Sequence, residues 1–244
     1  MEQIWLAIPI VIFAGVVRGF SGFGFTAIAV VGLNFFLEPQ QSVAVVLSLD
    51  VICSVNLWRA ALKQADLTTL KKLIFGSVLG IPVGYCFLLL IPAEILKLLI
   101  CIVILGLSLL LFSEFRPFNA EKTSTKIGFG LASGAGTASA SVGGPMILYY
   151  MLSSNLSTSS QRATMILFFI ASELVAVIGL IAGGMVDSTL PKAILILVIP
   201  TLIAGYVGQV LFKRKPPQSL KSFALPVMIA VALLGIINSA LILF

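Results

Sequence analysis

Three charged side chains inside long apolar stretches are the residues of this chain most able to act on a ligand: Arg18, Asp50 and Glu173. If those stretches cross a membrane, a charge at the bilayer centre costs at least ~2.5 kcal/mol, so each must face a partner or a cavity. The planar guanidinium of Arg18 matches the geometry of an oxyanion. The two carboxyl groups are candidates for proton coupling or gating, and a structural pairing with Arg18 or Arg162 is the alternative.

Arg18 opens a glycine-rich run that should interrupt its helix. The run reads Arg-Gly-Phe-Ser-Gly-Phe-Gly and ends at Gly24. A break within the membrane exposes amide groups at the start of the next helix, and with the helix dipole these attract an anion. Close helix packing by the glycines and an Arg18 that reaches the membrane interface form the alternative. The residues expected to bind a substrate here are Arg18, Gly19, Ser21, Gly22 and Gly24.

A second run of small residues, from Ser133 to Pro145, lies in the other half of the chain. Proline is a residue type that opens helices, and we expect Gly143 and Gly144 to supply a turn with positive φ. Hydroxyl groups in the run can donate hydrogen bonds without carrying charge. Two breaks at matched positions are typical of the central site of inverted-repeat transporters, although packing alone would also explain the glycines. The substrate-binding residues expected here are Thr137, Ser139, Ser141, Gly143, Gly144 and Pro145.

The elements that position these residues must be membrane helices. Of the 244 residues, 59% are hydrophobic and 10% are charged, whereas a soluble domain carries about 25% charged residues. The apolar runs are long and do not alternate with polar residues, which predicts helices rather than a barrel. Runs 24–37 and 144–153 are too short to cross, so we interpret them as limbs of broken or re-entrant helices. Full spans are expected at 43–61, 71–91, 94–112, 162–182, 192–211 and 222–244.

The two halves of the chain repeat each other. The clearest matches, at offsets of 119 and 121 residues, are Gly24 with Gly143, Asp66 with Asp187, and Gly84-Tyr85 with Gly205-Tyr206. A glycine-broken hairpin and three transmembrane helices in each half give an odd number of crossings, which turns the second half upside down. We therefore predict one all-α transmembrane domain over residues 1–244, with inverted repeats 1–112 and 127–244 and a cytoplasmic linker, 113–126.

The basic residues favour the inverted arrangement through the positive-inside rule. With the 62–70 loop in the cytoplasm, twelve of the fifteen Lys and Arg residues fall inside. Lys97 and Lys192 fall outside, and Arg18 lies within the first hairpin. Both termini are then expected to face outward. The first apolar run has no basic segment before it, so a cleaved signal peptide is not expected.

Several classes of function lack support in the sequence. The basic residues form no patch with interleaved aromatics, so nucleic acid is not an expected partner. The chain has no His and no Cys-x-x-Cys pair, which argues against a metal site or a Cys–His nucleophile. We interpret Cys53, Cys86 and Cys101 as packing residues. We predict no catalytic residue and no cofactor. The expected partners are a small anion and the lipid bilayer, and the sequence leaves a homo-oligomer open.

These motifs resemble those of the TauE/SafE family of membrane transporters, often called the sulfite exporter family, over essentially the whole chain. The run from Arg18 to Gly24 is similar to the first glycine-rich element in one branch of that family, and Gly143-Gly144-Pro145 is similar to the second. The usual element is richer, a Gly-x-Gly-Gly-Gly run with a proline several residues on. The resemblance implies transport of small anions, sulfite and organosulfonates being the usual examples, in the plasma membrane of a bacterium.

The leading hypothesis is a secondary anion transporter that works by alternating access and is coupled to protons. A passive anion channel of the same architecture is the alternative, which would conduct without saturation or proton dependence. A membrane-embedded enzyme would need a nucleophile, a metal or an acid–base pair at one site. Because His is absent and the carboxylates are isolated in the sequence, an enzyme is not expected.

Overall fold

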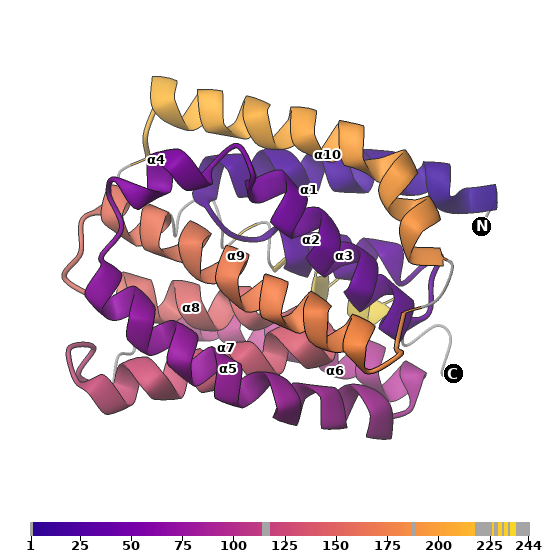
Figure 1. Ribbon diagram of the computed structural model, residues 1–244, viewed down its shortest axis with the longest axis horizontal. Helices are drawn as coiled ribbons and strands as arrows, with labels where there is room; N and C mark the ends of the chain where they lie inside the picture. The colour runs from indigo at the N-terminus through magenta and orange to yellow at the C-terminus, as the bar shows by residue number, and fades with distance from the viewer. Residues whose placement is uncertain are drawn as a thin grey trace.

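The computed structural model describes residues 2–113, 118–186 and 189–217, with isolated residues between 226 and 237. All regular structure in these residues is helical, which confirms the predicted all-α class (Figure 1). The elements are η1 (Glu2–Ala7), α1 (Ile8–Ser21), α2 (Phe25–Leu33), α3 (Pro39–Ser54), α4 (Trp58–Leu62), α5 (Leu67–Leu90), α6 (Ala93–Ser113), α7 (Thr123–Ala140), α8 (Gly143–Leu152), α9 (Thr158–Ala182) and α10 (Thr189–Arg214).

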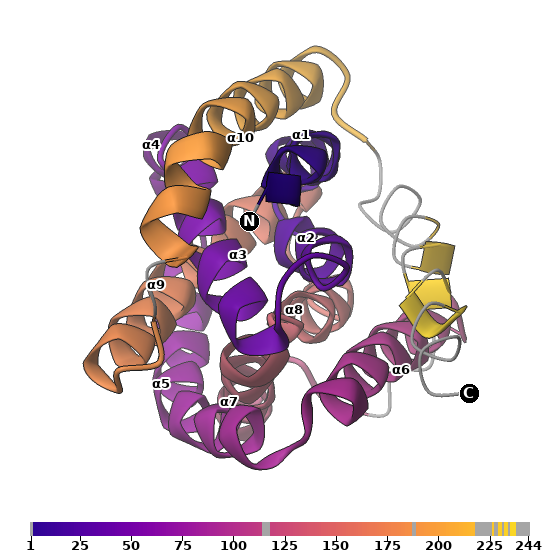
Figure 2. The ribbon, with the colours of Figure 1, turned by 90° about the vertical axis from the view of Figure 1, so that its right-hand side faces the viewer.

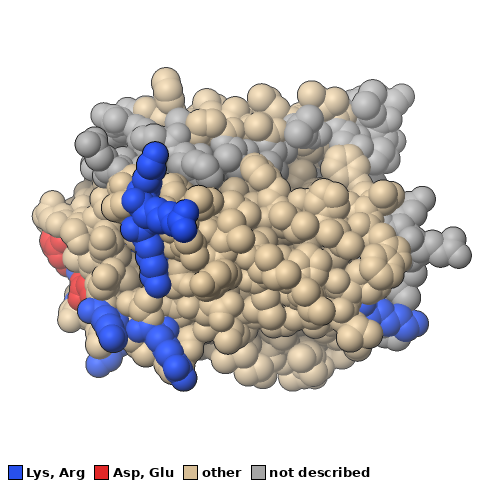
Figure 3. All heavy atoms as spheres, turned by 90° about the horizontal axis from the view of Figure 1, so that it is seen from above, with Lys and Arg blue, Asp and Glu red and all other residues tan. Residues whose placement is uncertain are grey.

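Three helices in the described part of the chain are long and apolar enough to cross a membrane, namely α5, α9 and α10. In Figure 3, Lys and Arg gather at one end of the molecule, the end at which α4 lies in Figure 1. A wide band without charged side chains separates them from the basic group visible at the opposite end. We call the first of these the basic end. Apolar helices and charge at the ends confirm a membrane protein.

The predicted span at 43–61 is wrong as a continuous helix, because α3 ends at Ser54 and α4 begins only at Trp58. Between them the amides of Val55 and Leu57 donate to carbonyls three residues earlier, at 3.1 and 2.9 Å. This is the tighter 3-10 pattern, which bends the chain at the basic end. The other described spans lie close to the predicted runs. The expected span 222–244 (apart from isolated helical residues), linker residues 114–117, Asp187 and Lys221 lie outside the described residues.

Two closely packed helix pairs form opposite sides of the molecule (Figures 1 and 2). One pair is α1 with α10, and the other is α5 with α7; α3 and α9 lie between the pairs. Glycines allow the close approach in both cases. A Cβ atom on Gly80 of α5 would overlap the Leu131 carbonyl of α7, and one on Gly19 of α1 would overlap the Gly205 carbonyl of α10. Each pair joins a helix from one half of the chain to a helix from the other half.

Each glycine-rich segment is a hairpin of two antiparallel helices. The end of α2 returns to the start of α1, since a Cβ atom on Gly32 would touch the Ile10 side chain. The end of α8 likewise returns to the start of α7, where the Tyr150 hydroxyl donates to the Ala120 carbonyl at 3.0 Å. A long and a short helix therefore turn back on each other in both halves.

The two hairpins begin at opposite ends of the molecule, and α5 connects those ends. At the basic end, Lys72 near the start of α5 donates to Thr123 at the start of α7 at 2.9 Å. At the other end, Leu88 and Ile91 share a small pocket with Glu38, which follows the first hairpin. The first hairpin thus opens toward the end opposite the basic one, and the second opens toward the basic end.

Replacing Gly80 with alanine should destabilise the protein, because the new methyl group would meet backbone of α7 that cannot rotate away. We expect a loss of ~1–3 kcal/mol, typical of an overpacked interior, measured by thermal unfolding of the purified protein in detergent. Gly128→Ala is the matched control, since a Cβ atom there has open space around it. That variant should gain up to ~1 kcal/mol from helix propensity. Equal stability of the two variants would contradict the predicted contact.

Asp66 caps the start of α5 outside the membrane span and should make stability depend on pH. Its carboxylate accepts from the Thr68 amide at 3.0 Å and the Thr69 hydroxyl at 2.6 Å. Burial alone would raise the pKa of Asp66, but these hydrogen bonds, the Thr69 amide and the charge of Lys126 bring the pKa below its ordinary value. A lowered pKa stabilises the fold above the pKa of the unfolded chain, and the stabilisation disappears as pH falls through the folded value.

We therefore expect Asp66→Ala to lower the free energy of unfolding by ~1 kcal/mol at neutral pH. The difference from the native protein should vanish in acid, where the native carboxyl is protonated. Asp66→Asn should keep most of the cap at neutral pH but lack this acid dependence. Thermal unfolding at several pH values measures all three proteins, and a constant Asp66→Ala difference across the acid range would disprove the linkage.

Candidate functional site

The first helix break is made by two glycines in a left-handed conformation. Gly22 has φ 81° and Gly24 has φ 94°, between the end of α1 and the start of α2. A side chain is strained at such φ values, which is why glycine occupies both positions. The Ser21 hydroxyl donates to the Val17 carbonyl at 2.7 Å and also lies 2.9 Å from the Phe23 carbonyl, so Ser21 braces the turn from within.

Arg18, one turn before this break, is completely buried. Its Nε lies 2.7 Å from Oδ1 of Asp50 on α3. Its Nη1 donates to the Gly22 carbonyl at 2.6 Å, and its Nη2 donates to the Ser54 hydroxyl at 2.9 Å. The face of the guanidinium lies 4.9 Å from the ring centroid of Phe169. Arg18 therefore ties the broken hairpin to α3 and α9.

The ion pair between Arg18 and Asp50 is close but poorly aligned as a hydrogen bond. Although the two atoms are 2.7 Å apart, neither Nε nor Oδ1 satisfies hydrogen-bond geometry with any described partner. Charge attraction, rather than a directed hydrogen bond, is what holds this carboxylate at the arginine. A ligand oxyanion that met the guanidinium in its plane would make the better-directed contact.

Glu173 of α9 completes a buried charged cluster. Its carboxyl group lies within hydrogen-bonding reach of the Asp50 carboxyl group, and both side chains are 1% exposed. Among the described residues, Oε2 of Glu173 has no hydrogen-bond partner. Two carboxyl groups therefore lie in the protein interior near one guanidinium, which contacts that of Asp50. This proximity of Asp50 and Glu173 could not be predicted from the sequence, because their helices lie far apart in the chain.

The second break differs from the predicted one. Ser141, not a glycine, takes the left-handed conformation, with φ 57°, whereas Gly143 and Gly144 begin α8 as helical residues. The expectation that these two glycines supply a positive-φ turn is therefore wrong. Gly143 is needed for space, because a Cβ atom there would overlap Thr137 and the Ser133 carbonyl of α7.

Ser141 is an unusual residue at this break. Left-handed conformations are uncommon for residues other than glycine, and they concentrate at functional sites. The Ser141 side chain is 1% exposed, and its hydroxyl has no hydrogen-bond partner in the described part of the chain. A buried hydroxyl without a partner is costly. This donor is thus available to a bound polar group.

One face of α9 connects the two breaks. Arg162, Ile166, Phe169 and Glu173 recur at the spacing of a single helix face. A Cβ atom on Gly22 of the first break would touch Arg162 and Ile166, and one on Gly144, just after the second break, would lie 3.9 Å from the Phe169 ring.

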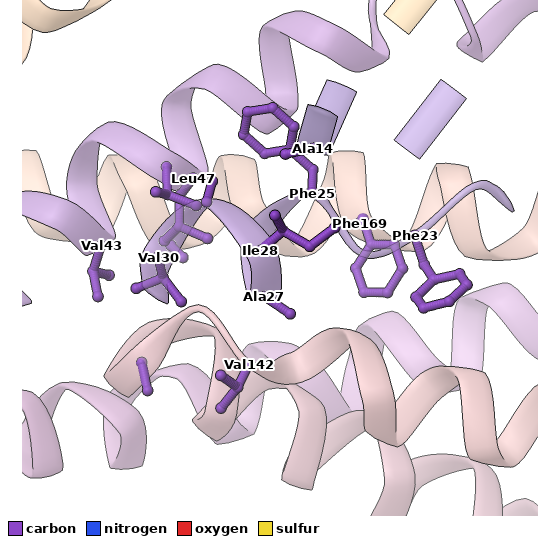
Figure 4. Packing of buried hydrophobic residues seen from close by; sticks show 14 of the residues in the cluster. Ala14, Phe23, Phe25, Ala27, Ile28, Val30, Val43, Leu47, Val142 and Phe169 are labelled. Atoms are coloured by element: carbon purple, nitrogen blue, oxygen red, sulfur yellow. The ribbon is translucent and has the colours of Figure 1, made fainter. Parts of the chain in front are cut away.

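The aromatic ring of Phe169 is where the two hairpins meet, since it also covers Arg18. Figure 4 shows Phe169 between Phe23 and Phe25 of the first break, and Val142 of the second break across from Ala27 of α2. These residues belong to one buried cluster. The structure therefore brings the two predicted breaks together through α9, a role for Phe169 that the sequence analysis missed.

Arg162 at the start of α9 makes a second buried contact to the first hairpin. Its Nε donates to the Phe20 carbonyl at 3.0 Å, and its Nη2 donates to the Gly19 carbonyl. Its guanidinium also lies 4.0 Å above the ring of Phe212 on α10. Arg162 thus joins α1, α9 and α10 at the basic end. The sequence analysis considered Arg162 as a structural partner of a buried carboxyl group, whereas in the described structure it binds backbone carbonyls of α1.

The other predicted site residues divide into packing and polar positions. Gly19 is helical and packs against α10, while its carbonyl accepts from Arg162. The Ser139 hydroxyl donates back to the Ala135 carbonyl of its own helix at 2.8 Å. Thr137 packs against Gly143, and Pro145 lies buried in the first turn of α8. Of these residues, Gly19 and Ser139 are thus engaged within the fold.

The cluster is closed to solvent on all sides in this conformation. Arg18, Asp50, Ser141 and Glu173 are each no more than 1% exposed. The first-turn amides of α2 and α8 have no side-chain cap at their described N-cap residues, Gly24 and Val142. Uncapped helix starts leave amide donors that suit an anion. Chemically, the arrangement offers one guanidinium, amides and a hydroxyl to a negative group, and two carboxyl groups to a proton.

Comparison with protein-family models gives a match to the family described as sulfite exporter TauE/SafE, over residues 7–234. Neither the comparison with curated proteins nor that with solved structures gives a match. The family match covers both hairpins and all the helices that surround the buried cluster. This chain therefore belongs to the TauE/SafE sulfite exporter family of membrane transporters.

Proposed function

We propose that this protein is a secondary transporter that binds a small anion, sulfur-containing by its family, between the two helix breaks. The observation that carries the proposal is the burial of Arg18 where the breaks converge on Phe169. A guanidinium inside a membrane protein is retained at high cost, which favours a functional role. The predicted ligands at the breaks include Ser141, whose hydroxyl has no described partner.

An inverted repeat would give this site its alternating access. Support comes from the hairpins, which open toward opposite ends, and from the pairing of α1 with α10 and of α7 with α5. A two-fold axis relating halves 1–112 and 127–244 would exchange α1 with α7 and α10 with α5. It would therefore turn the first helix pair into the second. In such transporters one half rocks against the other around a fixed central site. With the basic end in the cytoplasm of a bacterial cell, α1 would begin outside.

Arg162 would then hold the cytoplasmic end of the site closed, and we call this residue with its contacts the latch. It holds the carbonyls of Gly19 and Phe20 and the ring of Phe212 together across three helices. Moving α1 away from α9 would break these contacts and open a route to Gly22. A carrier needs such a closable end, whereas a passive channel needs a continuous path. The full burial of Arg18 and Asp50 therefore favours the carrier.

Asp50 and Glu173 would couple transport to protons. They are neighbours beside a single arginine, so ionisation of both would leave an excess negative charge in the interior. A proton held by the pair balances the arginine. Proton movement through these carboxyl groups would accompany the passage of an anion.

Replacing Arg18 with alanine should abolish transport, because the fully buried guanidinium that lies beneath the Phe169 ring would be lost. The test is flux of labelled sulfite into proteoliposomes, after a thermal-shift screen against sulfite, thiosulfate, sulfoacetate, sulfate and acetate. We expect at least a hundredfold fall in flux. Arg59→Ala is the control, because Arg59 is exposed on α4 beside Trp58. Undiminished flux in a folded Arg18→Ala protein would remove Arg18 from the mechanism.

Replacing Arg162 with alanine should open the basic end. Its hydrogen bonds are charge-assisted and contribute about 1.5–3 kcal/mol each, so their loss should raise the open population at least tenfold. The readout is labelling by a membrane-impermeant maleimide of a cysteine introduced as Ile166→Cys, beside Gly22. Arg59→Ala again serves as control, with the native cysteines measured in the same background. Unchanged labelling rates would rule out the latch.

A further inference from the structure

The Asp50 carboxylate occupies the place at Arg18 that a substrate anion would need. We infer that Asp50 is a built-in competitor of the substrate, and that the anion binds Arg18 only when Asp50 takes up a proton and leaves. This inference rests on the proposed anion site and specifies how that site is regulated. It makes one contact, Arg18 with Asp50, responsible for both anion binding and proton coupling.

The geometry of Arg18 supports competition rather than simultaneous binding. Each of its three nitrogens already faces a partner, which leaves one N–H on each Nη: Nε faces Asp50, Nη1 the Gly22 carbonyl and Nη2 the Ser54 hydroxyl. The Phe169 ring covers one face of the guanidinium. Among these partners only Asp50 carries a negative charge. An anion that displaced Asp50 would therefore keep a negative group at the guanidinium. Its contact is also the poorly directed one, which makes it the easiest to exchange for an aligned oxyanion.

The cluster stays neutral only if Asp50 is protonated when the anion binds to Arg18. In the closed state, the positive Arg18 is neutralised by one carboxylate, and the second carboxyl group holds the shared proton. An anion added without a proton would leave one uncompensated negative charge among side chains that are 1% exposed or less. If Asp50 is protonated as the anion arrives, the cluster is neutral before and after. One proton should therefore enter for each singly charged anion bound.

Few other groups can balance that charge. Arg162, whose charge acts on Arg18, is held by the carbonyls of Gly19 and Phe20. The titratable groups facing Asp50 are Arg18 from α1, Glu173 from α9 and Cys53 from α3 itself. Helix α2 contains no ionisable residue. At Cys53, α10 contributes the Thr201 carbonyl and Gly205, neither of which titrates. Glu173, within hydrogen-bonding reach, is the neighbour placed to pass a proton to Asp50.

The test measures proton uptake on anion binding by the purified full-length protein. The probe is methanesulfonate, whose charge does not change over the pH range used. Calorimetric titration in buffers of different ionisation enthalpy gives the number of protons taken up per anion. We expect about one, with the dissociation constant rising about tenfold for each pH unit above the titration of the pair.

Asp50→Asn should bind methanesulfonate at least as tightly as the native protein, because the competing carboxylate is gone. Proton uptake and pH dependence should disappear in Asp50→Asn/Glu173→Gln, since Glu173 alone can still neutralise Arg18 in the single variant. Ser54→Ala is the matched control: it removes a neutral partner of Arg18 and leaves the competing carboxylate in place, so the uptake of about one proton per anion should remain. Binding by the native protein without proton uptake would overturn the inference and leave the anion site intact, and it needs no variant to fold. Weaker binding by Asp50→Asn than by the native protein would also overturn it. If methanesulfonate binds neither the native protein nor Asp50→Asn, the proposed anion site fails as well.

Discussion

The constraint on which the structure depends is the burial of one guanidinium in the interior of a membrane protein. Arg18 cannot reach water, so the fold must supply its partners: the Asp50 carboxylate, the Gly22 carbonyl, the Ser54 hydroxyl and the Phe169 ring. Removing one partner of a buried pair leaves an uncompensated charge and is strongly destabilising. Much of the arrangement of α1, α3 and α9 follows from this requirement. The broken hairpin is held in place by the same residue that we propose to bind the substrate.

The backbone at the two helix breaks also needs hydrogen-bond partners within the membrane. Carbonyls near the first break need donors, and Arg18 and Arg162 provide them from the two sides of Gly22. At the second break, Ser133 donates to the Gly143 carbonyl at 2.9 Å, and Ser141 accepts the strained conformation. Full burial in protein is what permits irregular backbone at such depth. Both breaks are therefore costly features that the surrounding helices stabilise.

Close packing through glycine gives the scaffold around these breaks its shape. The pairs α1–α10 and α5–α7 approach until backbone touches backbone, which extends van der Waals contact where no hydrophobic driving force acts between helices. Because each pair joins the two halves of the chain, the halves cannot separate without breaking these contacts. The proposed movement of the latch at Arg162 is accordingly a rocking of packed helices and not their dissociation.

The sequence by itself determined the membrane environment, the helical class, the approximate location of both breaks and the presence of costly internal charges. Composition, run length and glycine content are local properties, so they can be read without knowing the neighbours. Only the tertiary structure decided that Arg18 meets Asp50 beside Glu173, that Phe169 joins the breaks, and that Ser141 takes the strained conformation in place of Gly143. Those outcomes depend on which helix faces lie together. Helix contact is set by packing between segments far apart in the chain, and no local pattern records it.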